Sequence, residues 1–245
     1  MEIITSRIFQ NYPEIIFGLS TKSGAETISP FGFNLSLTVG DDPDLVLANR
    51  EIFFNELGLT SGNVAFQKQV HSEIVTIVDN AGMIGESDAM ITSRIGIGLA
   101  VSTADCVPVF VYDRINRVIA GIHSGWRGTQ KKIVLKTLEC MRNRFNSNPA
   151  DLVIFVGPSI SQKNYEVGSE VALLFDRKYS VNSGSGIYLD VLQANIDMIR
   201  KFGIASDQIE ISPLCSYDEK EMLHSHRRDG KLSGRSLGVL AMVEN

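Results

Sequence analysis

Three side chains that commonly bind metals, His71, Cys106 and His123, each follow or end a strand pattern. The strand patterns concerned are Val64–Val70, Ile97–Ser102 and Arg117–Ile122. Strand ends are where α/β proteins gather their reactive groups, so we expect neighbouring strands to bring the three side chains together. Two imidazoles and one thiolate suit Zn²⁺, and three protein ligands leave the fourth position open, as in catalytic zinc sites, where bound water becomes acidic.

The same residues allow two other interpretations. Cys106 can act as a nucleophile without a metal, with His123 or His71 as its base. A lone cysteine at a strand end is also a common small buried residue, and single histidines often have a structural role. The residue types and their spacing leave these alternatives open.

The elements that must position these residues alternate along the chain. Further strand patterns rich in Val and Ile occur at Ile74–Val78, Val107–Tyr112, Leu152–Val156, Glu210–Ser212 and Leu237–Val243. Helix signals run from the Asp42 cap to Gly58, from Val134 to Phe145, from Ser169 to Arg177 and from the Asp190 cap to Gly203. The strand patterns Val64–Val70 and Ile74–Val78 are too close to each other for a helical crossover. We therefore predict one α/β (α+β) domain over residues 1–245, with a mixed β-sheet core flanked by helices.

The composition excludes several classes of protein. With 44% hydrophobic and 21% charged residues, the 245-residue chain resembles an ordinary globular protein. Its net charge of −5 argues against nucleic-acid and anionic-membrane partners. We find no signal peptide and no apolar run long enough to span a membrane, and three scattered cysteines do not suggest a disulfide framework. These features predict a cytoplasmic protein.

Several specific strings occur in a defined order along nearly the whole chain. They are Phe33–Ser36, Gly40–Asp42, Asn49–Arg50, Gln69–His71, Asp88–Thr92, Thr103–Pro108, His123–Thr129, Gly157–Ile160, Tyr165–Val167, Cys215, Ser225–Gly230 and Gly234–Arg235. With these strings the chain resembles the laccase-domain family, once called polyphenol oxidase and now regarded as purine nucleoside phosphorylase.

The resemblance implies a laccase-domain fold, similar to that of cytotoxic necrotizing factor, and a zinc site formed by His71, Cys106 and His123, with zinc rather than copper as the metal. It implies phosphorolysis of adenosine, inosine and guanosine to the free base and ribose-1-phosphate. It also implies adenosine deaminase and methylthioadenosine phosphorylase activities. The expected partners are purine nucleosides and phosphate, and the expected state is a monomer or homodimer.

The chain departs from the family pattern in three places. Ser124 replaces an alanine beside a ligand, and Ser72 replaces a glycine after His71, which we expect to narrow access to the metal. The aromatic-rich segment near the C-terminus reads Leu223–Gly230 here, with two histidines in place of aromatic residues. That change puts stacking of a base on this segment in doubt.

Phosphate binding requires positive charge and N–H donors. The candidates are Arg127, Arg50 and the pair Arg227 and Arg228, each of which could instead be a structural or solvated arginine. The amides of Gly125–Thr129, at the start of a helix, are further anion donors.

Other side chains are candidates for the chemistry and for ligand contact. We expect Asp105 to transfer the proton, with Glu166 as the second choice. Asp105, Cys106 and Arg127 form the predicted catalytic set. Alternatively, Asp105 orients a ligand histidine. Trp126 could stack on a purine or act as a packing anchor. Asn34 and Asp88 could contact substrate hydroxyls, although turn and capping roles explain them equally well.

Three competing functions remain on the sequence. They are a metal-free cysteine hydrolase using Cys106 and His123, a copper-dependent phenol oxidase, and a binding or cell-envelope accessory protein without catalysis. Four histidines in all are too few for a multicopper centre.

Overall fold

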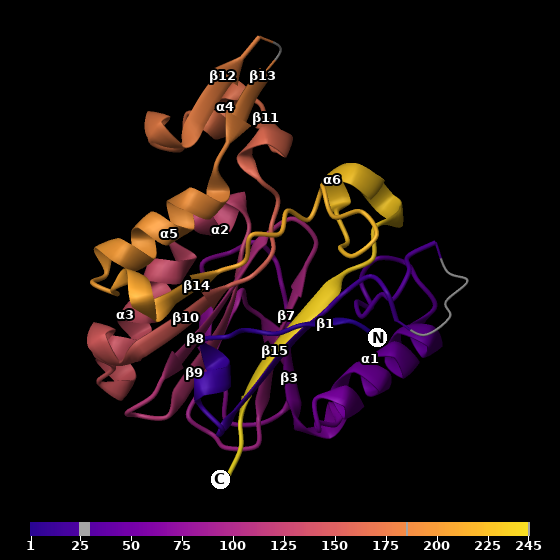
Figure 1. Ribbon diagram of the computed structural model, residues 1–245, viewed down its shortest axis with the longest axis vertical. Helices are drawn as coiled ribbons and strands as arrows, with labels where there is room; N and C mark the ends of the chain where they lie inside the picture. Colours follow the sequence, from indigo (N-terminus) through magenta and orange to yellow (C-terminus); the bar gives the residue numbers. More distant parts are fainter. Residues whose placement is uncertain (25–29, 185, 245) are drawn as a thin grey trace.

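Two six-stranded sheets pack face to face, and helices cover their outer surfaces (Figure 1). This computed structural model describes residues 1–24, 30–184 and 186–244. The first sheet has the order β1 (Ile3–Ile4), β2 (Ile15–Ser20), β15 (Ser236–Met242), β7 (Gly98–Thr103), β3 (Val64–Lys68) and β5 (Gly82–Glu86). The second has the order β14 (Ile209–Ile211), β10 (Leu152–Val156), β8 (Val107–Asp113), β9 (Val118–Ser124), β6 (Ala89–Thr92) and β4 (Val75–Ile77).

Alternation along the strands produces the layers. In β8, Phe110 and Tyr112 point into the core between the sheets, whereas the valines at 107, 109 and 111 point toward the helices. Gly121 of β9 lies where the two sheets are close together, because an added Cβ would be 3.0 Å from Val101 of the first sheet. Strands buried on both faces therefore show continuous apolar runs.

Three helices form the outer layers. α3 (Ile133–Phe145) and α5 (Val191–Lys201) pack on the second sheet, and α1 (Pro43–Glu56) packs on the first. Asp42 caps α1 and accepts a hydrogen bond from the amide of Asp44. The proline between them occupies the first helical position, which suits its fixed φ. Asp190 caps α5 through the amide of Gln193.

A small three-stranded sheet protrudes from this body (Figure 1). It consists of β11 (Glu166–Val167), β13 (Gly186–Leu189) and β12 (Ser180–Ser183), with α4 (Ser169–Ala172) beside it. The remaining short helices, α2 (Trp126–Gln130) and α6 (His226–Asp229), flank the site described below.

The predicted mixed α/β core is confirmed, with two corrections. Both sheets combine parallel and antiparallel pairs, but the core is a sandwich of two sheets rather than one sheet. The helix predicted over Ser169 to Arg177 ends at Ala172 and is followed by a turn and a short 3₁₀ segment, Arg177–Tyr179. No helix among the described residues is long and apolar enough to cross a membrane.

Candidate metal centre

His71, Cys106 and His123 meet at one end of the sandwich, where the chain passes from one sheet to the other. His71 follows β3 of the first sheet, and His123 lies near the end of β9 in the second. Cys106 lies in the short connection from β7 to β8, which joins the two sheets. β3 runs parallel to β7, and β8 runs antiparallel to β9, so all four strands bring these residues to the same end.

The potential ligand atoms of the three residues lie within 4.8 Å of one another. The rings of His71 and His123 stand edge to face with centroids 4.9 Å apart. His71 is exposed, Cys106 is half-buried and His123 is buried, so the group opens toward solvent on the His71 side. This donor set fits a catalytic zinc site, with three protein ligands and a position open to a further ligand.

Asp88 holds two of the three candidate ligands in place. Its carboxylate accepts a hydrogen bond from Nδ1 of His123 at 2.8 Å, which leaves the other ring nitrogen available to a metal. It also accepts the amide N–H groups of Val70, His71 and Ser72, and the hydroxyl of Ser72. These bonds hold His71 in a left-handed conformation at φ 57°, which turns the chain out of β3.

The electrostatics of the group stem from its burial and its close partners. Burial alone would raise the pKa of Cys106, but His123 and His71 lower it to about 6. Burial alone would lower the pKa of His123, but Cys106 and Asp88 raise it to about 9. Burial opposes ionisation of Asp88, yet hydrogen bonds from His123 and Ser72 keep its pKa below the ordinary value. At neutral pH the protein therefore offers a thiolate, which is the form of cysteine that binds metals.

Gly125 makes room for the three side chains. A Cβ at this position would lie 2.8 Å from Sγ of Cys106 and 2.9 Å from Nδ1 of His71. The segment His123–Thr129 is divided between two elements: His123 and Ser124 end β9, Gly125 caps α2, and Trp126 begins α2. The glycine is needed here for close approach to the cluster and not for an unusual backbone angle.

Asp105 lies beside the cluster but bonds to a different part of the chain. Its buried carboxylate accepts the hydroxyl of Ser216 at 2.7 Å and the amide of Arg227 at 2.6 Å. Its backbone has φ 87°, a conformation that non-glycine residues seldom adopt. Asp88 orients the ligand histidine, and no hydrogen bond joins Asp105 to a histidine within the described ranges.

Two exposed arginines of this region stack on aromatic side chains. Arg127, exposed at the start of α2, stacks on the Trp126 ring with its guanidinium 4.2 Å from the centroid. Trp126 is partly buried and also packs against the apolar core under the second sheet. Arg227, exposed in α6, stacks over Tyr165 at 4.9 Å and donates to the carbonyl of Glu166.

Four other predicted ligand contacts have their side chains engaged in the fold. Asp88 is fully buried, as described above, and so is Asn34, which bonds Ser36, Asp41 and the amide of Arg235. The guanidinium of Arg50 donates to the carbonyl of Leu35 and lies over Phe66, on the α1 side of the first sheet. Arg228 binds Asp229 and the carbonyls of residues 216, 217 and 223.

The sequence interpretation gave no role to two residues of this region. The pKa of Tyr165 is raised to about 12 by its burial and by the charges of Cys106 and Asp105, which outweigh the opposing arginines. Its hydroxyl therefore stays protonated. Arg235 lies close enough to Cys106 and Asp105 to interact with both charges, while burial lowers its pKa. Both residues belong to strings of the family resemblance, and that was the only sequence signal for them.

Known proteins are similar to this chain in sequence over nearly its whole length. The family described as multi-copper polyphenol oxidoreductase laccase matches residues 16–243. This chain belongs to the laccase-domain family. A protein of Bacteroides thetaiotaomicron named purine nucleoside phosphorylase is 32% identical over 93% of this chain and 91% of its own length. Purine nucleoside phosphorylase YlmD of Bacillus subtilis is 31% identical over 96% of this chain and 91% of its own length.

Solved structures of similar proteins have the same fold. The crystal structure of YlmD from Geobacillus stearothermophilus has a TM-score of 0.91 at 27% identity, covering 98% of this chain and 94% of that one. Hypothetical protein YfiH of Bacillus licheniformis has a TM-score of 0.90 at 29% identity, covering 95% and 94%. The predicted laccase-domain fold is therefore confirmed.

Proposed function

We propose that this protein is a zinc-dependent purine nucleoside phosphorylase. The observation that carries the proposal is the convergence of His71, Cys106 and His123 in a chain whose curated relatives are named purine nucleoside phosphorylases. Adenosine, inosine and guanosine are the proposed substrates with phosphate, and adenosine deamination and methylthioadenosine phosphorolysis are proposed at the same site. Three free cysteines, Cys106, Cys140 and Cys215, support a reducing cytoplasmic location.

The metal would be held by His71, Cys106 and His123. Bound zinc supplies Lewis acidity that stabilises negative charge and activates an oxygen ligand. One thiolate and two imidazoles favour zinc, and within the described chain only these two of the four histidines lie in such a cluster. His224 is buried against the carbonyl of Phe33, and His226 bonds the carbonyl of Gly230. This arrangement supports a single metal rather than a multicopper centre.

The remaining chemistry falls to the surrounding side chains. In phosphorolysis, a phosphate oxygen bonds to C1′ of the ribose, the bond from C1′ to the purine nitrogen breaks, and the purine takes up a proton. Arg127 and Arg227 have exposed guanidinium groups beside the cluster and are the proposed phosphate contacts. Asp105 is the proposed proton carrier, and the faces of Trp126 and Tyr165 are the proposed contacts for the purine.

Elemental analysis coupled to a phosphate-dependent nucleoside assay tests this function. We expect about one zinc per chain and formation of ribose-1-phosphate from inosine only when phosphate is present. Cys106→Ala should lose zinc and activity together, whereas Cys140→Ala, a change within α3, should keep both. Release of hypoxanthine without phosphate would overturn the phosphorylase, and stoichiometric copper in protein purified without added metal would overturn the zinc assignment.

A metal-free cysteine hydrolase is the second candidate. The pKa of Cys106 is about 6 and that of His123 is about 9, so at neutral pH the pair is a thiolate and an imidazolium. Such a pair favours nucleophilic catalysis by the cysteine. Chelation separates the two functions. Full activity in zinc-free protein, abolished by Cys106→Ala, would establish the hydrolase.

A further inference from the structure

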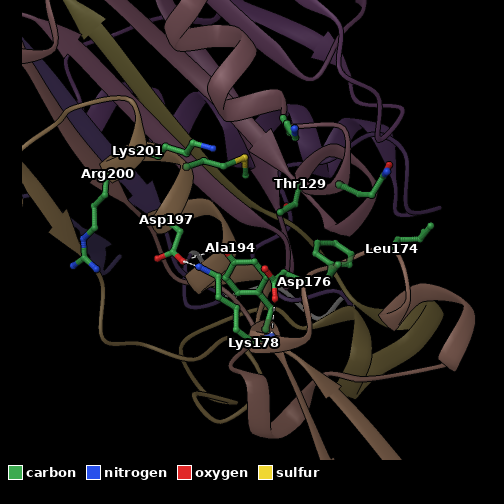
Figure 2. Close-up of a pocket in the computed structure, with 13 residues that line it drawn as sticks. Thr129, Leu174, Asp176, Lys178, Ala194, Asp197, Arg200 and Lys201 are labelled. Atoms are coloured by element: carbon green, nitrogen blue, oxygen red, sulfur yellow. Dashed lines mark hydrogen bonds and ion pairs between the residues drawn. The ribbon is translucent and has the colours of Figure 1, made fainter.

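A second hollow, separate from the metal centre, lies between α5 and the base of the protruding small sheet (Figure 2). Its volume is about 570 Å³, and its lining shares no residue with the metal cluster or with the side chains proposed to bind substrate. One wall comes from Thr129, Gln130 and Lys132, which follow the metal-site segment in the chain. The other walls come from α5 and from the segment 174–179.

The charge of this cavity is opposite to that of the protein. Its lining includes Lys132, Lys178, Arg200 and Lys201 but only Asp176 and Asp197, in a chain of net charge −5. Both acids are engaged: Asp197 pairs with Lys178, and Asp176 accepts the amide of Lys178 at the cap of a 3₁₀ turn. Within the described residues, the other three cations form no ion pair, so the cavity attracts an anion.

The same cavity also offers apolar surface. The rings of Phe175 and Tyr179 line it, together with Met198 and with Leu174, whose surface is 51% exposed. Figure 2 shows Leu174, Thr129, Ala194 and Lys201 arranged around this space. The walls therefore combine apolar and aromatic surface with charged groups, and the volume is in the range of small-molecule sites.

We propose that this cavity binds an anionic aromatic molecule of nucleotide size, with its ring on the Phe175 and Tyr179 side and its anionic group on the amines of Lys132 and Lys201. Each half of the ligand matches one kind of lining: planar apolar surface against the aromatic side chains, and a phosphate or comparable group against unpaired cations. A ligand with only one of these halves would leave the other kind of lining without a partner. Binding here is independent of the proposed chemistry at the metal centre.

The cavity is close to the metal centre through buried polar contacts. The hydroxyl of Thr129 accepts from the side-chain amide of Asn195 in α5, and Asn195 accepts from Ser124, the residue after His123. All three residues are buried. A ligand between α5 and Thr129 is therefore separated from the segment with His123 and Gly125 only by these three buried side chains.

Calorimetric titration with AMP and UMP tests the proposal. The comparison uses His71→Ala, because adenosine is a proposed substrate of the intact metal centre. In this variant we expect both nucleotides to bind, and adenosine and ribose 5-phosphate, each lacking one half, to bind at least about tenfold more weakly. The double variant K132E/K201E should weaken nucleotide binding at least about tenfold, while K136E, an exposed lysine of α3 outside the cavity, should leave it unchanged. Circular dichroism checks that each variant is folded.

Nucleotides can also occupy the metal centre, so the site of binding must be separated. His71→Ala removes an exposed member of the metal cluster and should leave this affinity intact. The methyl resonance of Met198, a lining residue, should shift on titration. Binding that is lost in His71→Ala but kept in K132E/K201E would overturn the proposal. So would no binding to wild-type protein at about 1 mM, or binding only to an acidic peptide.

Discussion

Two buried carboxylates, Asp88 and Asp105, flank the same metal centre and are connected to different parts of the protein. Asp88 accepts five hydrogen bonds from the segment 70–72 and from His123, so it is tied to the metal ligands themselves. Asp105 accepts bonds from Ser216 and Arg227 in the C-terminal segment. Two identical carboxylates thus have different surroundings. Asp88 is bonded to the proposed metal ligands, and Asp105 is bonded to the segment that carries the proposed substrate contact Arg227.

The largest expected effect is on the Asp105 side. Asp105→Asn should reduce kcat by roughly 10²–10⁴-fold, the range of general acid–base catalysis, because the amide cannot carry the proton. Zinc content should not change. Steady-state kinetics with inosine and phosphate, together with metal analysis, measures both quantities.

Ser216→Ala is the control for this change. It removes one hydrogen bond to Asp105 and keeps the carboxylate, so most activity should remain. Equal losses in the two variants, or loss of zinc in Asp105→Asn, would show that Asp105 only maintains the structure.

His224 provides a test of stability on the same side, because His224 and Asp105 line one small cavity. Burial lowers the pKa of His224 from 6.5 to about 4. The unfolded chain therefore takes up the proton first, so the stability present above pH 6.5 is lost as the pH falls through about 4. The loss amounts to roughly 3 kcal/mol when complete.

Urea unfolding between pH 7 and pH 4 measures this loss. His224→Gln should flatten the pH dependence relative to wild type, whereas His226→Gln, at an exposed position, should leave it unchanged. An unaltered slope in His224→Gln would assign the acid sensitivity to other groups.

On the Asp88 side we expect a smaller effect, and we expect it on zinc affinity. Asp88→Asn should weaken zinc affinity about 10–100-fold, since the amide cannot replace the carboxylate that orients His123. In zinc-free protein, the pH midpoint for alkylation of Cys106 should lie near 6 in wild type and higher in the variant, because His123 loses part of its positive charge.

Asp113→Asn is the matched control. Asp113 is equally buried and bonds the backbone beyond the far end of β8, so its loss should affect stability without affecting zinc. A competitive chelator titration of both variants gives the comparison. The same zinc affinity in Asp88→Asn and wild type would remove the positioning role of Asp88.

The smallest expected effect concerns the arginine on each side. Arg127→Ala should raise KM for phosphate about tenfold with little change in the KM for inosine, as for loss of one charged hydrogen bond. Arg227→Ala should act in the same direction, and Arg94→Ala, paired with Asp79 on the surface, should have no effect. A normal phosphate KM in both Arg127 and Arg227 variants would move the phosphate site elsewhere.

The elements with the clearest patterns were predictable. Leu152–Val156 has the predicted bounds, and α1 and α5 begin at their predicted caps because a side-chain cap and a proline are local signals. β1, β2, β5, β6 and the small sheet were missed. β6 is four residues long and is stabilised by pairing with β4 and β9, which lie apart from it in the sequence.

The sequence by itself determined the donor types at His71, Cys106 and His123 and the strand ends that carry them, because apolar patterns and turn residues are local. Only the tertiary structure decided that these strands belong to two sheets meeting at one end, and which residues bond to each carboxylate. Asp88 and Asp105 differ in their hydrogen-bond partners, and those partners come from residues as distant as Arg227. Such pairings depend on long-range packing, which no local pattern encodes.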